Sequence, residues 1–191
     1  MEADWEIELG GGAPVIDVSW AGFVDLRRSP EKASELSEVL LLPALASPLV
    51  RLNSPHSFVY SVKCDVWPIT EIDPLEFDAP EQLAAHGMAV YLDLVPCDPT
   101  LWTNPEKAIP WCRTVSARLK SVALCCCRID LVVRRAIRTP DLDDGIGITA
   151  YCAACGPTVE AAAAHLGSVL AVFADSIQPG VPRGPAHSTL Q

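Results

Sequence analysis

The chain has 191 residues, half of them hydrophobic (50%), and its 14 lysines and arginines are outnumbered by 24 aspartates and glutamates. A chain of this length and composition can bury a core without disulfides or structural metals. The net charge of −10 repels phosphate backbones, which excludes nucleic-acid binding through a general basic surface.

The N-terminus, MEADWEIEL, contains no basic region followed by an apolar stretch, so no signal peptide is predicted. The most apolar late segment, 161–173, is too short to span a bilayer and carries His165. We therefore predict a cytoplasmic protein without membrane contact, whose eight cysteines stay reduced.

Apolar alternation and helix-start signals place the expected elements along the chain. Proline follows a capping residue at Ser29-Pro30 and Asn104-Pro105, and more loosely at Gly156-Pro157. Helices are therefore predicted from these three points, the first ending or kinking at Pro43, with a short helical piece at 44–52. The predicted strands are 5–9, 15–20, 58–67, 88–95, 124–138 and 146–154.

This order of elements predicts one α+β domain, residues 1–177, with an antiparallel sheet that carries its helices on one face. The nearest common arrangement is the ferredoxin-like plait, built from β-α-β repeats. Residues 68–86 form a long acidic loop interrupted by proline, which we expect to be solvated and without a structural role. The Pro/Gly-rich tail 178–191 is predicted to be disordered.

Side chains alternate between the two faces of a strand, so each predicted strand divides into two sets. One set is aliphatic and faces the helices. The other mixes carboxylates, arginines and aromatic rings, the composition of surfaces that meet a protein partner or a second copy of the chain. A solvated face whose Asp–Arg pairs only set the strand register is the alternative. The predicted binding residues are Trp67, Tyr91, Asp93, Arg128, Asp130, Arg134 and Tyr151.

The cysteines suggest a second kind of site. Strand alternation predicts that Cys125 and Cys127 face the core while Cys126 points away, and that one of the first two approaches Cys155. The run Cys152-Ala-Ala-Cys155 precedes a helix start, where a thiol pKa is lowered. The spacing differs from that of a zinc ribbon. In a thioredoxin-like motif the first cysteine opens the helix, whereas here the Gly-Pro cap follows both cysteines, so we predict buried packing, with no metal and no cofactor.

Three hypotheses for function follow. The first is a non-enzymatic binding or assembly module that uses its open sheet face, of which an acidic immunity- or inhibitor-type protein that masks a basic partner is one version. The second is a thiol- or metal-dependent enzyme that uses Cys125, Cys127, Cys152 and Cys155. The third is a hydrolase or transferase, which needs two carboxylates from the Asp-rich strands to meet in one pocket.

Overall fold

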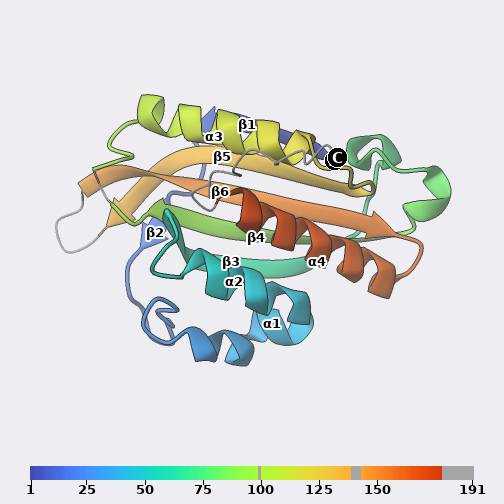
Figure 1. Cartoon of the computed structure of the whole chain (residues 1–191), viewed down its shortest axis with the longest axis horizontal. Helices are drawn as coiled ribbons and strands as arrows, with labels where there is room; N and C mark the ends of the chain where they lie inside the picture. The colour runs from blue at the N-terminus through green and yellow to red at the C-terminus, as the bar shows by residue number, and fades with distance from the viewer. Residues whose placement is uncertain (99, 139–142, 178–191) are drawn as a thin grey trace, which may run out of the picture.

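The computed structural model describes residues 1–98, 100–138 and 143–177, so the predicted disordered tail lies outside the described residues. Within these ranges a six-stranded sheet carries helices on one side (Figure 1). Every predicted strand is present, with shifted bounds. The strands are β1 (Glu2–Glu8), β2 (Val15–Asp17), β3 (Val59–Ile69), β4 (His86–Pro96), β5 (Cys127–Arg138) and β6 (Asp143–Gly156).

The strand order is β1-β5-β6-β4-β3, and β2 pairs with β5 beyond the end of β1. The prediction of an α+β fold with one open sheet is confirmed, but the prediction that all neighbouring strands are antiparallel is wrong. β1 and β2 run parallel to β5, whereas the other pairs are antiparallel. Parallel pairing needs a long connection, and most of the chain lies between β1 and β5.

The helices are α1 (Ser37–Leu41), α2 (Ala46–Leu52), α3 (Pro105–Lys120) and α4 (Val159–Ser176), with short 3₁₀ turns at Pro30–Glu35, Pro43–Leu45, Pro74–Phe77 and Glu81–Leu83. α3 begins where predicted, because the Asn104 side chain accepts a hydrogen bond from the Lys107 N–H at 3.2 Å. α4 begins two residues after Pro157, because Thr158 is the residue that caps it. The first predicted helix is broken at Leu36, whose backbone is extended.

The core lies between the sheet and the helices. α4 packs on β4 and β6, α3 packs on β1 and β5, and α2 packs beside β3. Aliphatic residues from the middle of the strands, such as Leu92, Ile129 and Ile148, meet Leu170 and Phe173 of α4 and are fully buried. α4 is long and apolar enough to cross a membrane by length and composition alone. Its apolar stripe, however, is the part of the helix that packs on the sheet.

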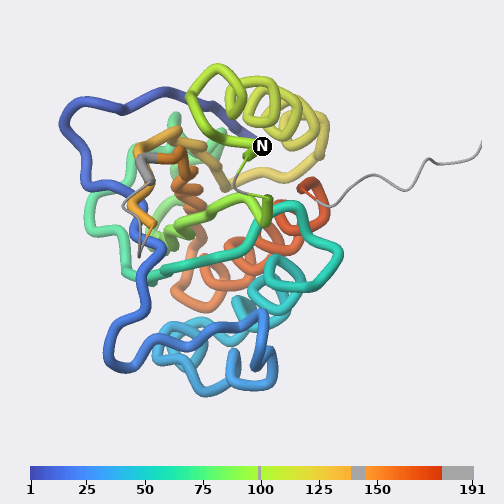
Figure 2. Tube along the Cα trace, turned by 90° about the vertical axis from the view of Figure 1, so that its left-hand side faces the viewer, coloured from blue at the N-terminus to red at the C-terminus, as the bar shows by residue number. Residues whose placement is uncertain are grey.

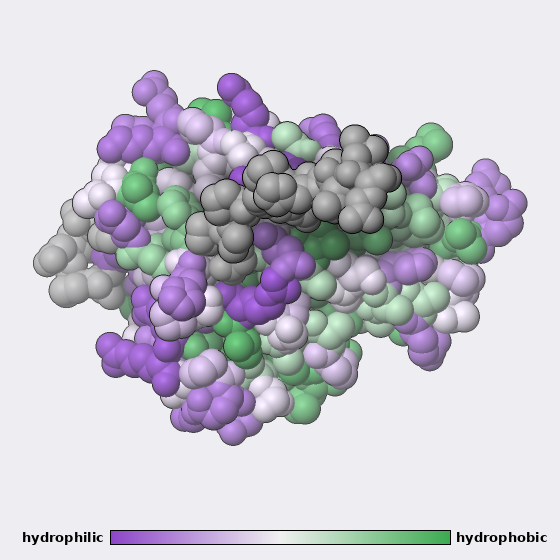
Figure 3. Space-filling model, viewed as in Figure 1, coloured by the Kyte–Doolittle hydropathy of each residue, from purple (hydrophilic) through white to green (hydrophobic). Residues whose placement is uncertain are grey.

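Among the described residues no α-helix lies on the opposite face of the sheet, and the N-terminal segment runs along that side (Figure 2). The helix side, by contrast, shows hydrophilic and hydrophobic residues interspersed over its surface (Figure 3). We call the side without α-helices the uncovered face, and it holds the candidate site.

Candidate binding surface on the uncovered face

The N-terminal segment closes one end of the uncovered face. Val15 of β2 is fully buried and packs with Tyr60, Val95 and Ala136, which come from three different strands. The Tyr60 hydroxyl donates a 2.6 Å hydrogen bond to Asp17, and the Arg27 guanidinium lies 3.9 Å from the centre of the same ring. These contacts fasten the segment across the sheet, so this end is closed to a partner.

Residues 70–85 close the other end. Phe77, at the end of a 3₁₀ turn, is 4% exposed and packs on Cys126 and Cys155. Gly87 lies so close to Ile69 and Ile72 that an added Cβ would meet their side chains at 2.9 and 3.0 Å. The prediction that this acidic connection has no structural role is therefore wrong. Its apolar residues give it a buried anchor that the acidic composition concealed.

Between these two covers lies a band of polar and aromatic side chains, which we call the central band. Residues that pair across β1, β5, β6, β4 and β3 form rows across this band. One such row is Asp4, Asp130, Tyr151, Tyr91 and Asp65. All seven predicted binding residues belong to the central band. Its members are Glu2, Asp4, Glu6, Glu8, Lys63, Asp65, Trp67, Tyr91, Asp93, Arg128, Asp130, Val132, Arg134, Thr149 and Tyr151.

Three aromatic rings form a ladder through the middle of the central band. The ring centres of Trp67 and Tyr91 lie 6.0 Å apart, and those of Tyr91 and Tyr151 lie 6.2 Å apart. Cations border the ladder: Lys63 lies 5.6 Å from the Tyr91 ring centre, and Arg134 lies 5.6 Å from that of Tyr151. Rings held by neighbours lose little freedom on binding, which suits them to anchor a partner.

The charges of the central band are mostly negative. Seven carboxylates (Glu2, Asp4, Glu6, Glu8, Asp65, Asp93 and Asp130) face three cations (Lys63, Arg128 and Arg134). Two of these cations are paired within the band, since Arg128 meets Asp130 at 2.6 Å and Arg134 meets Glu8 at 2.7 Å. A third carboxylate, Asp4, is paired with Lys120 of α3 at 3.1 Å. A pocket of about 450 Å³ lies over β1 and β5 beside these pairs. The band therefore offers a partner more unneutralised negative than positive charge.

Asp93 differs from the other predicted contact residues because it is only 8% exposed. The Thr149 hydroxyl donates a 2.6 Å hydrogen bond to its carboxylate. Burial raises the pKa of Asp93 above its ordinary value, and that hydrogen bond lowers it by less. Asp93 thus supports the floor of the band, and its carboxylate is poorly placed to reach a partner.

The cysteine cluster differs from the prediction at its first residues. Cys126 has φ of +61°, a left-handed conformation that interrupts strand alternation just before β5 begins. As a result Cys125 is exposed, whereas Cys126 is buried and meets Cys155 under Phe77. Cys127 does face the core as predicted. Cys155 therefore has Cys126 as its partner in the hydrophobic cluster under Phe77, the cysteine that strand alternation had directed away from the core.

The buried thiols are poorly suited to nucleophilic chemistry. Burial raises the pKa of Cys126 to about 12 and that of Cys127 to about 11, and it also raises the pKa of Cys152 and Cys155. The reactive species is the thiolate, which such pKa values suppress. Among the described residues no group of three or more His, Cys, Asp or Glu side chains is arranged to hold a metal ion.

Sequence reasoning missed the contribution of β1 to the central band. The acidic residues at positions 2, 4, 6 and 8 alternate with Ala3, Trp5 and Ile7, so the period-two signal was present. What was absent was any local indication that this strand pairs with β5, more than a hundred residues later in the numbering. Comparisons with protein families, with curated proteins and with solved structures found no match to this chain.

Proposed function

We propose that this protein is a non-enzymatic binding module that holds a basic protein partner on the central band. The observation that carries the proposal is the aromatic ladder of Trp67, Tyr91 and Tyr151 within a mostly acidic band. Tyrosine and tryptophan are enriched at the energetic centres of protein interfaces. The two covers frame the band and give a partner a defined docking region.

Charge favours a basic partner over a second copy of the chain. Two copies that each carry −10 repel one another, and in the central band their carboxylates would have to meet. A cationic partner gains from the same field, both in its rate of encounter and in its orientation. Masking the active surface of a basic enzyme, as immunity and inhibitor proteins do, is the most specific form of this proposal.

The fold supports a rigid platform for this role. β4, α3 and β5 form a split β-α-β unit, since β6 lies between β4 and β5 and is antiparallel to both. This unit is shared with the ferredoxin-like plait, and we propose that the four strands β3 to β6 with α3 and α4 are a variant of that plait. The central band lies on this packed sheet, so binding needs little ordering of the chain.

The proposal is tested with a partner purified from cells that contain the protein, followed by calorimetric titration. Tyr91→Ala removes the middle ring of the ladder and should weaken binding by about thirtyfold, the effect expected of a hot-spot residue. Lys107→Ala, at an exposed position on α3, is the matched control and should bind like the unmodified protein. Added salt should also weaken binding.

Two results would overturn the proposal. One is equal binding by the Tyr91 and Lys107 variants, which would place the partner elsewhere on the molecule. The other is a stable dimer in light scattering that Tyr91→Ala dissociates, because the occupant of the band would then be a second copy.

A further inference from the structure

The sheet has two edges, formed by β3 on one side and by β1, followed farther along β5 by β2, on the other. An edge strand has backbone N–H and C=O groups that point away from the sheet and can pair with another chain. Folded proteins usually block such edges with proline, bulges or covering segments. The two edges of this sheet differ in this respect.

The hydrogen-bond register shows which backbone groups of β1 point outward. The Cys155 N–H donates to the Cys126 carbonyl at 2.9 Å, just before β5 begins. The even-numbered residues of β5, from Arg128 onward, therefore direct their backbone N–H and C=O groups toward β6. The odd-numbered residues of β5 direct their backbone groups toward β1. In a parallel pair with this register, the backbone N–H and C=O groups of Ala3, Trp5 and Ile7 point away from β5, toward the open edge. In agreement, the Ser116 hydroxyl from α3 donates to the Ala3 carbonyl at 2.7 Å.

The β3 edge is blocked along its length. By the same alternation its outward residues are Val59, Ser61, Cys64, Val66 and Pro68. The Val59 N–H donates to the Ser57 hydroxyl oxygen at 3.4 Å. The Ser61 N–H donates to the Asn53 side chain at 3.3 Å, the Val66 N–H donates to the side chain of its own neighbour at 2.8 Å, and Pro68 has no N–H. A bulge between positions 61 and 63 further interrupts the strand.

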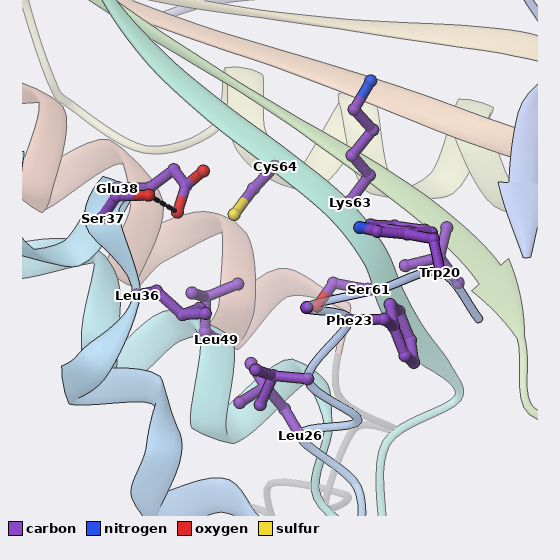
Figure 4. Close-up of a pocket in the computed structure, with 13 residues that line it drawn as sticks. Trp20, Phe23, Leu26, Leu36, Ser37, Glu38, Leu49, Ser61, Lys63 and Cys64 are labelled. Atoms are coloured by element: carbon purple, nitrogen blue, oxygen red, sulfur yellow. Dashed lines mark hydrogen bonds between the residues drawn. The ribbon is translucent and has the colours of Figure 1, made fainter. Parts of the chain in front are cut away.

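Cys64 is the remaining outward position on β3, and other segments enclose it. Figure 4 shows Cys64 and Lys63 pointing to opposite sides of β3. Cys64 points to the side on which Glu38 of α1 lies, and Trp20 and Phe23 lie farther along the strand. These residues line a pocket of about 210 Å³ beside the edge. No extended chain can run along β3 without displacing them.

Between Trp5 and Ile7, the described residues show none of the features that block the β3 edge. Within the described part of the chain, neither outward N–H has a hydrogen-bond partner. Ile7 is 44% exposed and Leu9 is 39% exposed, so apolar surface continues along this edge. On the other face of β1 four carboxylates stand in a row, at positions 2, 4, 6 and 8, separated by about 7 Å at strand rise. Asp4 and Glu8 of this row are paired with Lys120 and Arg134, so Glu2 and Glu6 lie between and beside these pairs.

We propose that the edge of β1 accepts a strand from the basic partner, which extends the sheet by one strand. The incoming strand has lysine or arginine at alternate positions, opposite the carboxylate row, and apolar residues on the side of Ile7. The carboxylate row repels a second β1, because like charges would lie opposite one another in the new pair. This inference rests on the proposed function and names the part of the partner that this edge recognises.

The experiment uses two peptides of about eight residues, one alternating lysine with valine and the other alternating glutamate with valine. Amide hydrogen exchange at Trp5 and Ile7 should slow about tenfold with the lysine peptide and not with the glutamate peptide. Ile7→Pro removes an outward N–H without breaking the ladder to β5, and Ile7→Ala removes the side chain but keeps that N–H. Affinity for the lysine peptide should fall at least about tenfold for the proline variant relative to the alanine variant.

Glu6→Lys provides a second variant in case Ile7→Pro does not fold. It should weaken binding of the lysine peptide and strengthen binding of the glutamate peptide. The inference is overturned if exchange at Trp5 and Ile7 is unchanged, if both peptides act alike, or if folded Ile7→Pro binds like Ile7→Ala. Its failure is separable from that of the proposed function. If Tyr91→Ala weakens binding of the purified partner while Ile7→Pro does not, the proposal of docking on the central band is retained and the inference of strand addition is rejected.

Discussion

The contact between Val15 and Gly147 allows a direct test of the N-terminal cover. A Cβ placed on Gly147 would meet three atoms of the Val15 side chain at 2.8, 2.9 and 3.0 Å. Overpacking of this kind costs about 1–3 kcal/mol, and loss of glycine flexibility in the unfolded chain returns about 0.4–1 kcal/mol. We therefore expect Gly147→Ala to lower the free energy of unfolding by about 1–2 kcal/mol.

The partner substitution makes the prediction specific to this contact. Val15→Ala removes two buried methyl groups, which should lower the free energy of unfolding by about 2–3 kcal/mol. It also removes two of the three close atoms, so the double variant should be about 1 kcal/mol more stable than the sum of the single effects predicts. Gly10→Ala is the control, because nothing lies within 4 Å of its added Cβ, and it should change stability by less than about 0.5 kcal/mol.

Equilibrium unfolding in urea, followed by circular dichroism, measures all four variants. Strict additivity of the Val15 and Gly147 effects would contradict the reasoning, since it would mean that the two side chains do not share one space. The N-terminal segment would then not cover that end of the sheet. The central band would be larger than described, and a partner could reach the strands beneath Val15.

Two further predictions concern the other cover and the floor of the band. Phe77→Ala should lower the free energy of unfolding by about 3–4 kcal/mol and speed labelling of Cys126 by a thiol reagent, whereas Leu75→Ala, at an 86% exposed position in the same turn, should do neither. Asp93→Asn should raise the free energy of unfolding near neutral pH, because the folded-state pKa of this carboxyl is raised and its charged form opposes folding. The amide can still accept the Thr149 hydrogen bond, so the gain in stability over the unmodified protein should shrink as pH falls through the folded-state pKa. It should vanish below the ordinary aspartate pKa, and a gain that persists there in urea unfolding would contradict this explanation.

Much of the candidate site followed from local patterns. The period of two in β3, β4, β5 and β6 placed Trp67, Tyr91, Arg134 and Tyr151 on the side away from the helices, because strand geometry allows no other choice once the aliphatic residues are buried. The cap at Asn104 and the apolar stripe of α3 were also readable, since both depend on residues a few positions apart.

Other parts of the site depended on contacts between distant segments. The parallel pairing of β1 with β5 brought four carboxylates to the band, and Val15 and Phe77 closed its two ends, although the local sequence around each of them permits other partners. The left-handed turn at Cys126 left Cys125 exposed, where strand alternation had predicted a core position.

The amino-acid sequence by itself determined which side chains share a face, because that depends on backbone period and on burial of apolar groups. Only the tertiary structure decided which part of that face stays open and which sheet edge stays free. Those outcomes depend on where distant segments pack, and the free energy of such packing belongs to the assembled core rather than to any one stretch of chain.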